Sequence, residues 1–417
     1  MTPPQGISSP LRLSKSRYLS GLQCHKRLYL EVHSPDLASD PDEQIEARLK
    51  MGTQIGESAR ERFPDGVRVD VEPLGISGAI SRASELMADP NVPAIFEGMF
   101  AFQDVRVRVD VLERAGSEGW RLVEVKSSTQ VKEGHLDDVA IQEFVLVGTG
   151  IRIERSELMH INTQYIYPGG EPDLGQLFSR QDVTPEVEAR QLDIPSRLAA
   201  MRERLAASTP PDIEPDHHCF DPYECPFWDH CTQVKPLRWV FYLPGGKRIF
   251  QELTSLGVQS IDEIPVNFQL TCIQQRMKNN VEWIGPGLKA ELNSVRYPIH
   301  HLDFETFMPA IPQYPNTKPY QTIPFQWSDH IVTRDGGMRH EEYLCTDSKD
   351  PREEFIQTLF KSIGQAGTIC VYSGYEARIL KELADAFPGF RPDLERATER
   401  LWDLLSVIRT HYYHPGF

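Results

Sequence analysis

Residues 94–126 read AIFEGMFAFQDVRVRVDVLERAGSEGWRLVEVK, and this stretch decides the fold that the sequence predicts. Two segments in which apolar and polar residues alternate flank the turn AGSEG, a pattern typical of two adjacent β-strands. Because side chains alternate along a strand with period two, Asp110 falls on the polar face of the first strand. Glu124 and Lys126 project together from the second.

An Asp on one strand followed by Glu-x-Lys on its neighbour is the PD-(D/E)XK arrangement. Asp110 and Glu124 would hold a divalent cation, Mg²⁺ or Mn²⁺, that polarises a phosphodiester and activates water. Lys126 would steady the attacking water or the developing charge, and the backbone carbonyl of Val125 would be an extra ligand. The alternative is an ordinary exposed sheet face with a salt bridge.

Composition limits the class of protein. The 417 residues suggest two or three domains, and 40% hydrophobic with 25% charged residues is typical of a globular protein. No run of eighteen apolar residues or signal-peptide core occurs, so we expect a cytoplasmic protein without a membrane partner. The net charge of −16 argues against a protein that coats nucleic acid through bulk charge. It argues less against an enzyme with a local basic groove, for which the candidates are Lys15, Arg17, Lys26, Arg27, Lys126 and Lys132.

The seven cysteines argue against a disulfide framework, since their number is odd. Cys219, Cys225 and Cys231 lie in one stretch that Pro222 and Pro226 keep out of a helix. Cys24, beside basic residues that favour a thiolate, is the candidate fourth ligand. One remote cysteine plus a late triplet suits a 4Fe-4S cluster. A mixed zinc site completed by His218 or His230 stays open. Each remaining cysteine is predicted to be an ordinary core residue: Cys272, Cys345 and Cys370.

The stretch HLDDVAIQEFVLVGTGI, which begins at His135, predicts a helix that carries Gln142. With this helix, residues 12–235 resemble the RecB-like nucleases, including CRISPR-associated and AddB-type members. In that family the Asp and Glu-x-Lys motifs precede a helix with a Gln motif, and one early and three late cysteines hold a 4Fe-4S cluster. The resemblance implies that Gln142 orients the site or the DNA.

Two features depart from the family pattern. Many relatives carry a metal-binding His on the first helix in a Gly-x-x-x-His motif, whereas this chain has Gly52 and then Gly56 at the place of the histidine. Glu57, or Glu97 one strand earlier than Asp110, would be a substitute ligand. The late cysteines are also spaced differently from the Cys-x-x-Cys pair of many relatives.

Residues 236–295 show short helical periods broken by glycine-rich turns, which predict a helical connector. A new domain is expected from residue 296, where a short strand presents Asp303 and Glu305 on one face. A second strand and helix follow, with Glu376 at the start of the helix, and Asp403 is expected within the later helix ERLWDLLSVIRTHYY.

The second region resembles the DnaQ-like exonucleases of the RNase H-like fold, and an uncharacterised bacterial domain often fused to the RecB-like module. The resemblance implies that Asp303, Glu305, Glu376 and Asp403 bind metal. The last acidic motif of that fold is expected beyond residue 417, so the region is expected to be incomplete at its C-terminus.

The sequence therefore predicts an α/β protein with three parts: a PD-(D/E)XK restriction-endonuclease-like core at residues 1–235, a helical connector at 236–295, and a partial RNase H-like domain at 296–417. The expected function is a metal-dependent DNA nuclease, an exonuclease on single-stranded DNA or DNA ends, that serves repair, recombination or defence. The alternative is a catalytically degenerate nucleic-acid-binding or scaffold protein with a zinc or iron-sulfur site.

Overall fold

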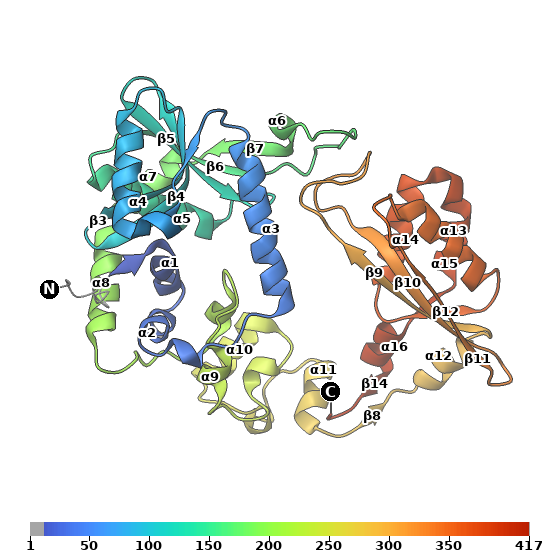
Figure 1. Ribbon diagram of the computed structural model, residues 1–417. Helices are drawn as coiled ribbons and strands as arrows, with labels where there is room; N and C mark the ends of the chain where they lie inside the picture. Colours follow the sequence, from blue (N-terminus) through green and yellow to red (C-terminus); the bar gives the residue numbers. More distant parts are fainter. Residues whose placement is uncertain (1–11, 417) are drawn as a thin grey trace. The chain divides into compact units, whose positions relative to one another are not determined.

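The computed structural model describes residues 12–416, which form a mixed α/β protein with several sheets. The chain divides into two compact units, Met1–Val234 and Lys235–Phe417. In Figure 1 the blue and green segments belong to the first unit, and the orange and red segments belong to the second. Residues 1–11, where no signal-peptide core is expected, lie outside the described residues. No helix within residues 12–416 combines the length and the apolar character that a membrane crossing requires.

A seven-stranded sheet forms the centre of the first unit. Six strands follow the order β2-β3-β4-β5-β6-β7, and β1 pairs with β4. The strands are β1 (Leu13–Ser14), β2 (Val67–Arg68), β3 (Ala94–Phe102), β4 (Val105–Ala115), β5 (Gly119–Lys126), β6 (Ile153–Ile161) and β7 (Phe178–Asp182).

Strands β3, β4 and β5 form an antiparallel meander. Gln103 and Asp104 join β3 to β4, and both have positive φ (47° and 58°), as a two-residue hairpin turn requires. Strand β6 is parallel to β5, so the chain must cross over between them, and helix α5 (Glu133–Gly148) makes that crossover. The strand-turn-strand expectation for residues 105–126 is confirmed.

The core of the first unit lies between this sheet and its helices. Alternate valines of β4, at positions 105, 107, 109 and 111, are at most 1% exposed. Helix α5 contacts β3, β4 and β6 and buries Leu136, Val139 and Ile141 (Figure 1). The other helices are α1 (Lys15–Gln23), α2 (His25–His33), α3 (Glu43–Arg60), α4 (Val71–Ala88), α6 (Leu174–Leu177), α7 (Thr184–Gln191), α8 (Ile194–Ala206) and α9 (Trp228–Thr232).

The second unit contains a five-stranded sheet with the order β11-β10-β9-β12-β13. Strands β9, β10 and β11 are antiparallel neighbours, whereas β12 is parallel to both β9 and β13. The strands are β9 (Ile299–Phe307), β10 (Ile323–Val332), β11 (Met338–Leu344), β12 (Thr368–Val371) and β13 (Leu401–Asp403). Phe304, Trp327, Phe355 and Ile369 are buried in its core.

The helices of the second unit are α10 (Gly246–Ser255), α11 (Cys272–Asn279), α12 (Leu288–Ser294), α13 (Arg352–Ile363), α14 (Tyr375–Ala386), α15 (Arg391–Glu399) and α16 (Leu404–His411). A small sheet pairs β8 (Trp283–Ile284) with β14 (Tyr412–Tyr413). Residues 236–295, which the sequence predicts to be helical, therefore carry three short α-helices and one short strand.

Asp403 differs from its expected position inside a helix. It is the last residue of β13, where it pairs with Val371, and its side chain caps α16 by accepting a hydrogen bond from the backbone N–H of Ser406 at 3.2 Å. Aspartate is a preferred N-cap because its carboxylate satisfies a free N–H of the first turn. Helix α16 therefore begins at Leu404, the residue after Asp403, and not at Glu399 as the sequence predicts.

Candidate functional site

Asp110 and Glu124 come from neighbouring antiparallel strands, β4 and β5. The register pairs Val111 with Val123, which places Asp110 and Glu124 as the next facing residues. The backbone N–H of Val125 donates to Oδ2 of Asp110 at 2.9 Å. Among residues 12–416, no hydrogen bond is made to the other oxygen of Asp110. This oxygen is therefore available to a ligand.

Glu124 is only 2% exposed, and donors surround its carboxylate. Its Oε1 accepts from Lys126 Nζ at 2.6 Å and from Lys15 Nζ at 3.0 Å. Its Oε2 accepts from Gln142 Nε2 at 2.8 Å. A buried carboxylate is costly unless it is paired and hydrogen-bonded, and these three donors supply that pairing.

Asp138 is a member of this group that the sequence analysis missed. It is 4% exposed, and its carboxylate contacts Lys126 Nζ at 2.5 Å, Lys15 Nζ at 3.1 Å and Gln142 Nε2 at 2.9 Å. Residues four apart share a helix face, so the i, i+4 spacing from Asp138 to Gln142 was a usable signal. We call Asp110, Glu124 and Asp138 the acidic cluster.

Burial and neighbouring charge set the protonation of the cluster. Burial, and then the charge of Glu124, raise the pKa of Asp110 to about 7 and also raise the pKa of Asp138. Burial alone would raise the pKa of Glu124, but the ammonium groups of Lys126 and Lys15 hold it below its usual range. Burial would lower the pKa of each lysine, yet the carboxylates raise both. Glu124 is thus the ionised centre of the cluster, between two protonated lysines.

Gln142 is fully buried on α5. Its Nε2 is bonded to both Glu124 and Asp138, while its Oε1 is a buried oxygen without a hydrogen-bond partner within residues 12–416. The side chain therefore fixes the positions of two carboxylates and keeps one acceptor free.

The two expected substitute ligands lie apart from the acidic cluster. Glu57 is exposed on α3, and Glu97 on β3 pairs with Arg60 at 2.6 Å and with Arg108 at 2.8 Å. Across residues 12–416, no hydrogen bond or ion pair joins either side chain to the cluster.

The oxygen donors of the cluster fit a hard divalent cation, because carboxylate and carbonyl oxygens are the ligands that Mg²⁺ and Mn²⁺ prefer. Yet no group of three or more His, Cys, Asp or Glu within residues 12–416 is already arranged to hold a metal ion. At the acidic cluster, the ammonium groups of Lys15 and Lys126 lie against oxygens that a cation would use.

Four cysteines from distant parts of the sequence line one small cavity. Cys24 lies between α1 and α2, Cys219 and Cys225 lie in the late loop, and Cys231 lies in α9. The Nε2 of Gln23 fastens the early segment to this loop by donating to two of its backbone carbonyls at 2.9 and 2.7 Å. All seven cysteines are free thiols.

The chemistry of this cavity suits a thiolate-bound metal group. Burial raises the pKa of Cys225 to about 11 and also raises the pKa values of Cys219 and Cys231. A metal supplies the positive charge that buried thiolates need, and four thiolates match the donor set of a 4Fe-4S cluster. His218 lines the cavity as well, so the zinc alternative keeps one candidate nitrogen ligand. His230 is not among the residues that line it.

Three acids of the second unit also influence one another. Glu376 is 4% exposed at the start of α14, and its Oε2 has no hydrogen-bond partner within the described residues. Burial, and then the charges of Asp303 and Asp403, raise its pKa. Glu305 lies on the same exposed face of β9 as Asp303, in register with Gln326 of β10.

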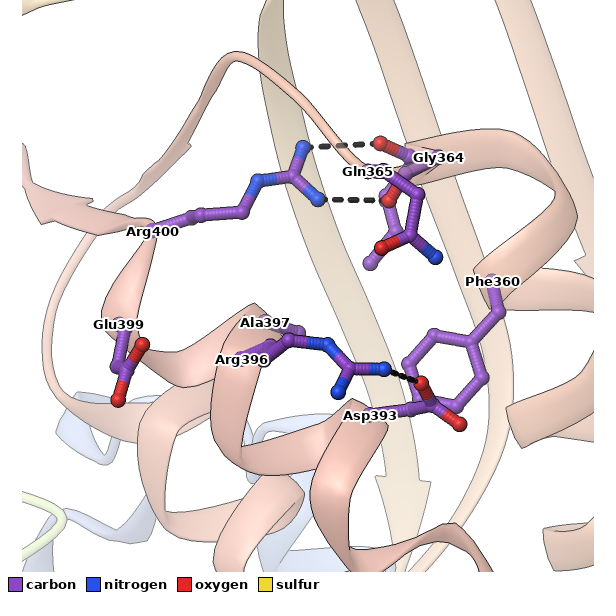
Figure 2. A pocket seen from close by; sticks show the side chains of 9 residues that line it. Phe360, Gly364, Gln365, Asp393, Arg396, Ala397, Glu399 and Arg400 are labelled. Atoms are coloured by element: carbon purple, nitrogen blue, oxygen red, sulfur yellow. Dashed lines mark hydrogen bonds and ion pairs between the residues drawn. The ribbon is translucent and has the colours of Figure 1, made fainter.

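A cavity of about 350 Å³ lies on the second unit beside α13 and α15, and none of the predicted site residues lines it. Figure 2 shows that the guanidinium of Arg400 bonds to backbone carbonyls at one side, while Arg396 pairs with Asp393 at the other. Both arginines of its wall, Arg396 and Arg400, are thus already partnered within the fold.

Residues 300–417 match the model of a family described as "Domain of unknown function (DUF2779)". The comparison with curated proteins gave no match. Solved structures that match include one described as "Crystal structure of SSO0001", with 14% identity, 47% of this chain and 77% of that chain covered, and a TM-score of 0.23. At that TM-score the likeness supports no inference about fold or function.

Proposed function

We propose that the first unit is a metal-dependent deoxyribonuclease with a PD-(D/E)XK core, which hydrolyses phosphodiesters in single-stranded DNA or at DNA ends. The observation that carries the proposal is the group formed by Asp110, Glu124 and Lys126 on two adjacent strands, with the carboxylate of Glu124 buried at its centre. Asp138 and Gln142 of the next helix complete it. An ordinary exposed sheet face would not bury two acids and hold two partly exposed lysines against them.

Each side chain has a role that follows from its contacts. Asp110 and Glu124 would hold a divalent cation, which when bound polarises the phosphodiester and activates water. Lys126 would steady the attacking water and the negative charge that develops on the phosphate. Asp138 holds the ammonium of Lys126 in place, and Gln142 fixes the carboxylate of Glu124.

We further propose that Cys24, Cys219, Cys225 and Cys231 bind a structural 4Fe-4S cluster. The support is their convergence on one cavity from segments almost two hundred residues apart, as the positions 24 and 219 show. Because the thiols join the two ends of the first unit, the cluster would hold the unit together instead of taking part in hydrolysis.

The decisive experiment compares wild type, Lys126→Met and Lys50→Met on end-labelled single-stranded DNA with Mn²⁺ or Mg²⁺. Lys50 is an exposed lysine of α3 and serves as the matched control. Lys126→Met should lower the cleavage rate by on the order of a hundredfold or more, because it removes a charge that acts in the transition state. Lys50→Met should cleave at the wild-type rate. Full activity in Lys126→Met would refute the assignment.

The competing candidate is a nucleic-acid-binding or scaffold protein without catalysis. Two observations favour it: Gly56 stands where many relatives carry a metal-binding histidine, and the possible substitute Glu57 is exposed and apart from the acidic cluster. If the wild-type protein binds single-stranded DNA but shows no turnover with either metal, this candidate is correct.

A second nuclease site in an RNase H-like second unit is a further candidate, favoured by the unpartnered buried oxygen of Glu376 near Asp303 and Asp403. Glu376→Gln can separate cleavage by the second unit from cleavage by the first. Cleavage that persists in Lys126→Met and disappears when Glu376→Gln is added would assign that residual activity to the second unit.

A further inference from the structure

Two ammonium groups share the acidic cluster, but they are held differently. Lys126 Nζ lies 2.6 Å from Glu124 and 2.5 Å from Asp138. Lys15 Nζ lies 3.0 Å from Glu124 and 3.1 Å from Asp138, and its charge also acts on Asp110. Lys15 therefore faces all three acids from the side of α1, at the longer distances.

A divalent cation needs the same oxygens that Lys15 contacts. Oε2 of Glu124 is bonded to Gln142, so Oε1, which Lys15 and Lys126 share, is the oxygen of Glu124 nearest to both positive charges. A divalent cation held by the carboxylates of Asp110 and Glu124 would compete with the ammonium of Lys15, which contacts Oε1 of Glu124. Two positive charges this close repel strongly in a buried site, so one of them must leave.

Of the two lysines, Lys15 is the one that can leave. The two side chains are almost equally exposed, at 22% and 23%, but Lys15 is the first residue of α1 and makes the longer contacts with Glu124 and Asp138. Lys126 is in register with His160 of the neighbouring strand β6 and makes the shorter contacts. The long, flexible lysine side chain can turn toward solvent without any movement of α1.

We propose that Lys15 is the internal counter-ion of the acidic cluster: it neutralises the carboxylates when no metal is bound, and it yields its place to the divalent cation. The affinity for the divalent cation then depends on its competition with the ammonium group of Lys15. This inference rests on the proposed function, because it assumes that the acidic cluster is the metal site. If Lys15 competes with the metal, removing its charge should strengthen metal binding. If Lys15 only supports the structure, removing its charge should weaken metal binding, so the two roles can be distinguished.

The test is calorimetric titration of the full-length protein with Mn²⁺ alone, without DNA. Lys15→Met keeps most of the side-chain volume and removes the charge, so it should bind Mn²⁺ about tenfold more tightly than wild type. Its metal-free form should unfold at a lower temperature, and Mn²⁺ should raise that temperature more than it does in wild type. Lys50→Met, which removes an exposed charge on α3, should bind Mn²⁺ as wild type does.

Lys15→Gln is the second neutral variant if Lys15→Met does not fold, and it should also tighten binding. Lys15→Arg keeps the positive charge and should not bind Mn²⁺ more tightly than wild type. Equal or weaker Mn²⁺ binding in the neutral variants would overturn the inference. If Asp110→Asn weakens Mn²⁺ binding in that case, the proposed function survives without it. If wild type binds no Mn²⁺, the proposed function fails and the inference fails with it.

Discussion

Arg400 should be one of the most sensitive positions of the second unit. Its guanidinium donates to the backbone carbonyls of Ile363, Gly364, Ala366 and Gly367, at the end of α13 and in the turn before β12. In Arg400→Met, water can replace the donor at the exposed Gly364 and Ala366 but less readily at Ile363 and Gly367. Two partly buried bonds to a charged donor at about 1.5 kcal/mol each give a loss of about 3 kcal/mol.

Hydrogen exchange measured by mass spectrometry can localise this loss to the second unit, which global unfolding of a two-unit chain cannot do. The peptide that contains β12 is the reporter, since the N–H of Ile369 donates to the carbonyl of Arg400 at 2.9 Å. A loss of about 3 kcal/mol corresponds to exchange more than about a hundredfold faster. Arg396→Met, which removes only a mostly exposed pair with Asp393, should stay within about 0.5 kcal/mol of wild type. Equal protection of β12 in the two variants would show that the carbonyl contacts of Arg400 contribute little.

Two further predictions concern the first unit. Burial raises the pKa of Glu143, against the opposing hydrogen bond from Ser156, so the folded state favours its neutral form. The stability from this group is complete below the unfolded pKa of 4.5 and is lost as pH rises through the folded pKa. In urea unfolding between pH 4.5 and 8, the free energy of unfolding should therefore fall less in Glu143→Gln than in wild type. The same pH profile in both proteins would contradict this. Cys231→Ser should lose the iron and the brown colour of anaerobically purified protein, because it removes one of four thiolates. Cys345→Ser, which alters a thiol outside the cysteine-lined cavity, should retain both, and equal iron content in the two variants would argue against the proposed ligand set.

The local elements around the acidic cluster could be predicted from the sequence because their signals are short in range. Period-two alternation placed Asp110 on one strand and Glu124 with Lys126 on the next, and the AGSEG turn fixed which strands were adjacent. Apolar spacing identified the helix with Gln142. The functional roles of these residues stay predictions.

Contacts between distant segments could not be predicted in the same way. Lys15 reaches Glu124 across 109 positions, and no local pattern indicates that pairing. Asp138 was missed for another reason: its i, i+4 spacing to Gln142 was a usable local signal, and the structure buries Asp138 while Asp137 contacts Arg197. The position of Asp403 was missed because the apolar spacing of α16 continues back into β13, where strand pairing with β12 prevails over helix propensity.

Helix α1 connects the two candidate sites of the first unit, the acidic cluster and the cysteine-lined cavity. The helix has nine residues, begins with Lys15 at the acidic cluster and ends at Gln23, directly before Cys24, so about 13 Å of rigid backbone separates Lys15 from Cys24. It is packed tightly, since a Cβ on Gly21 would lie 2.7 Å from Cε of Met201. A displacement of the sulfur end would therefore carry the lysine with it. A single inserted residue would rotate one end by about 100° against the other, so the spacing between Lys15 and Cys24 is itself a structural requirement.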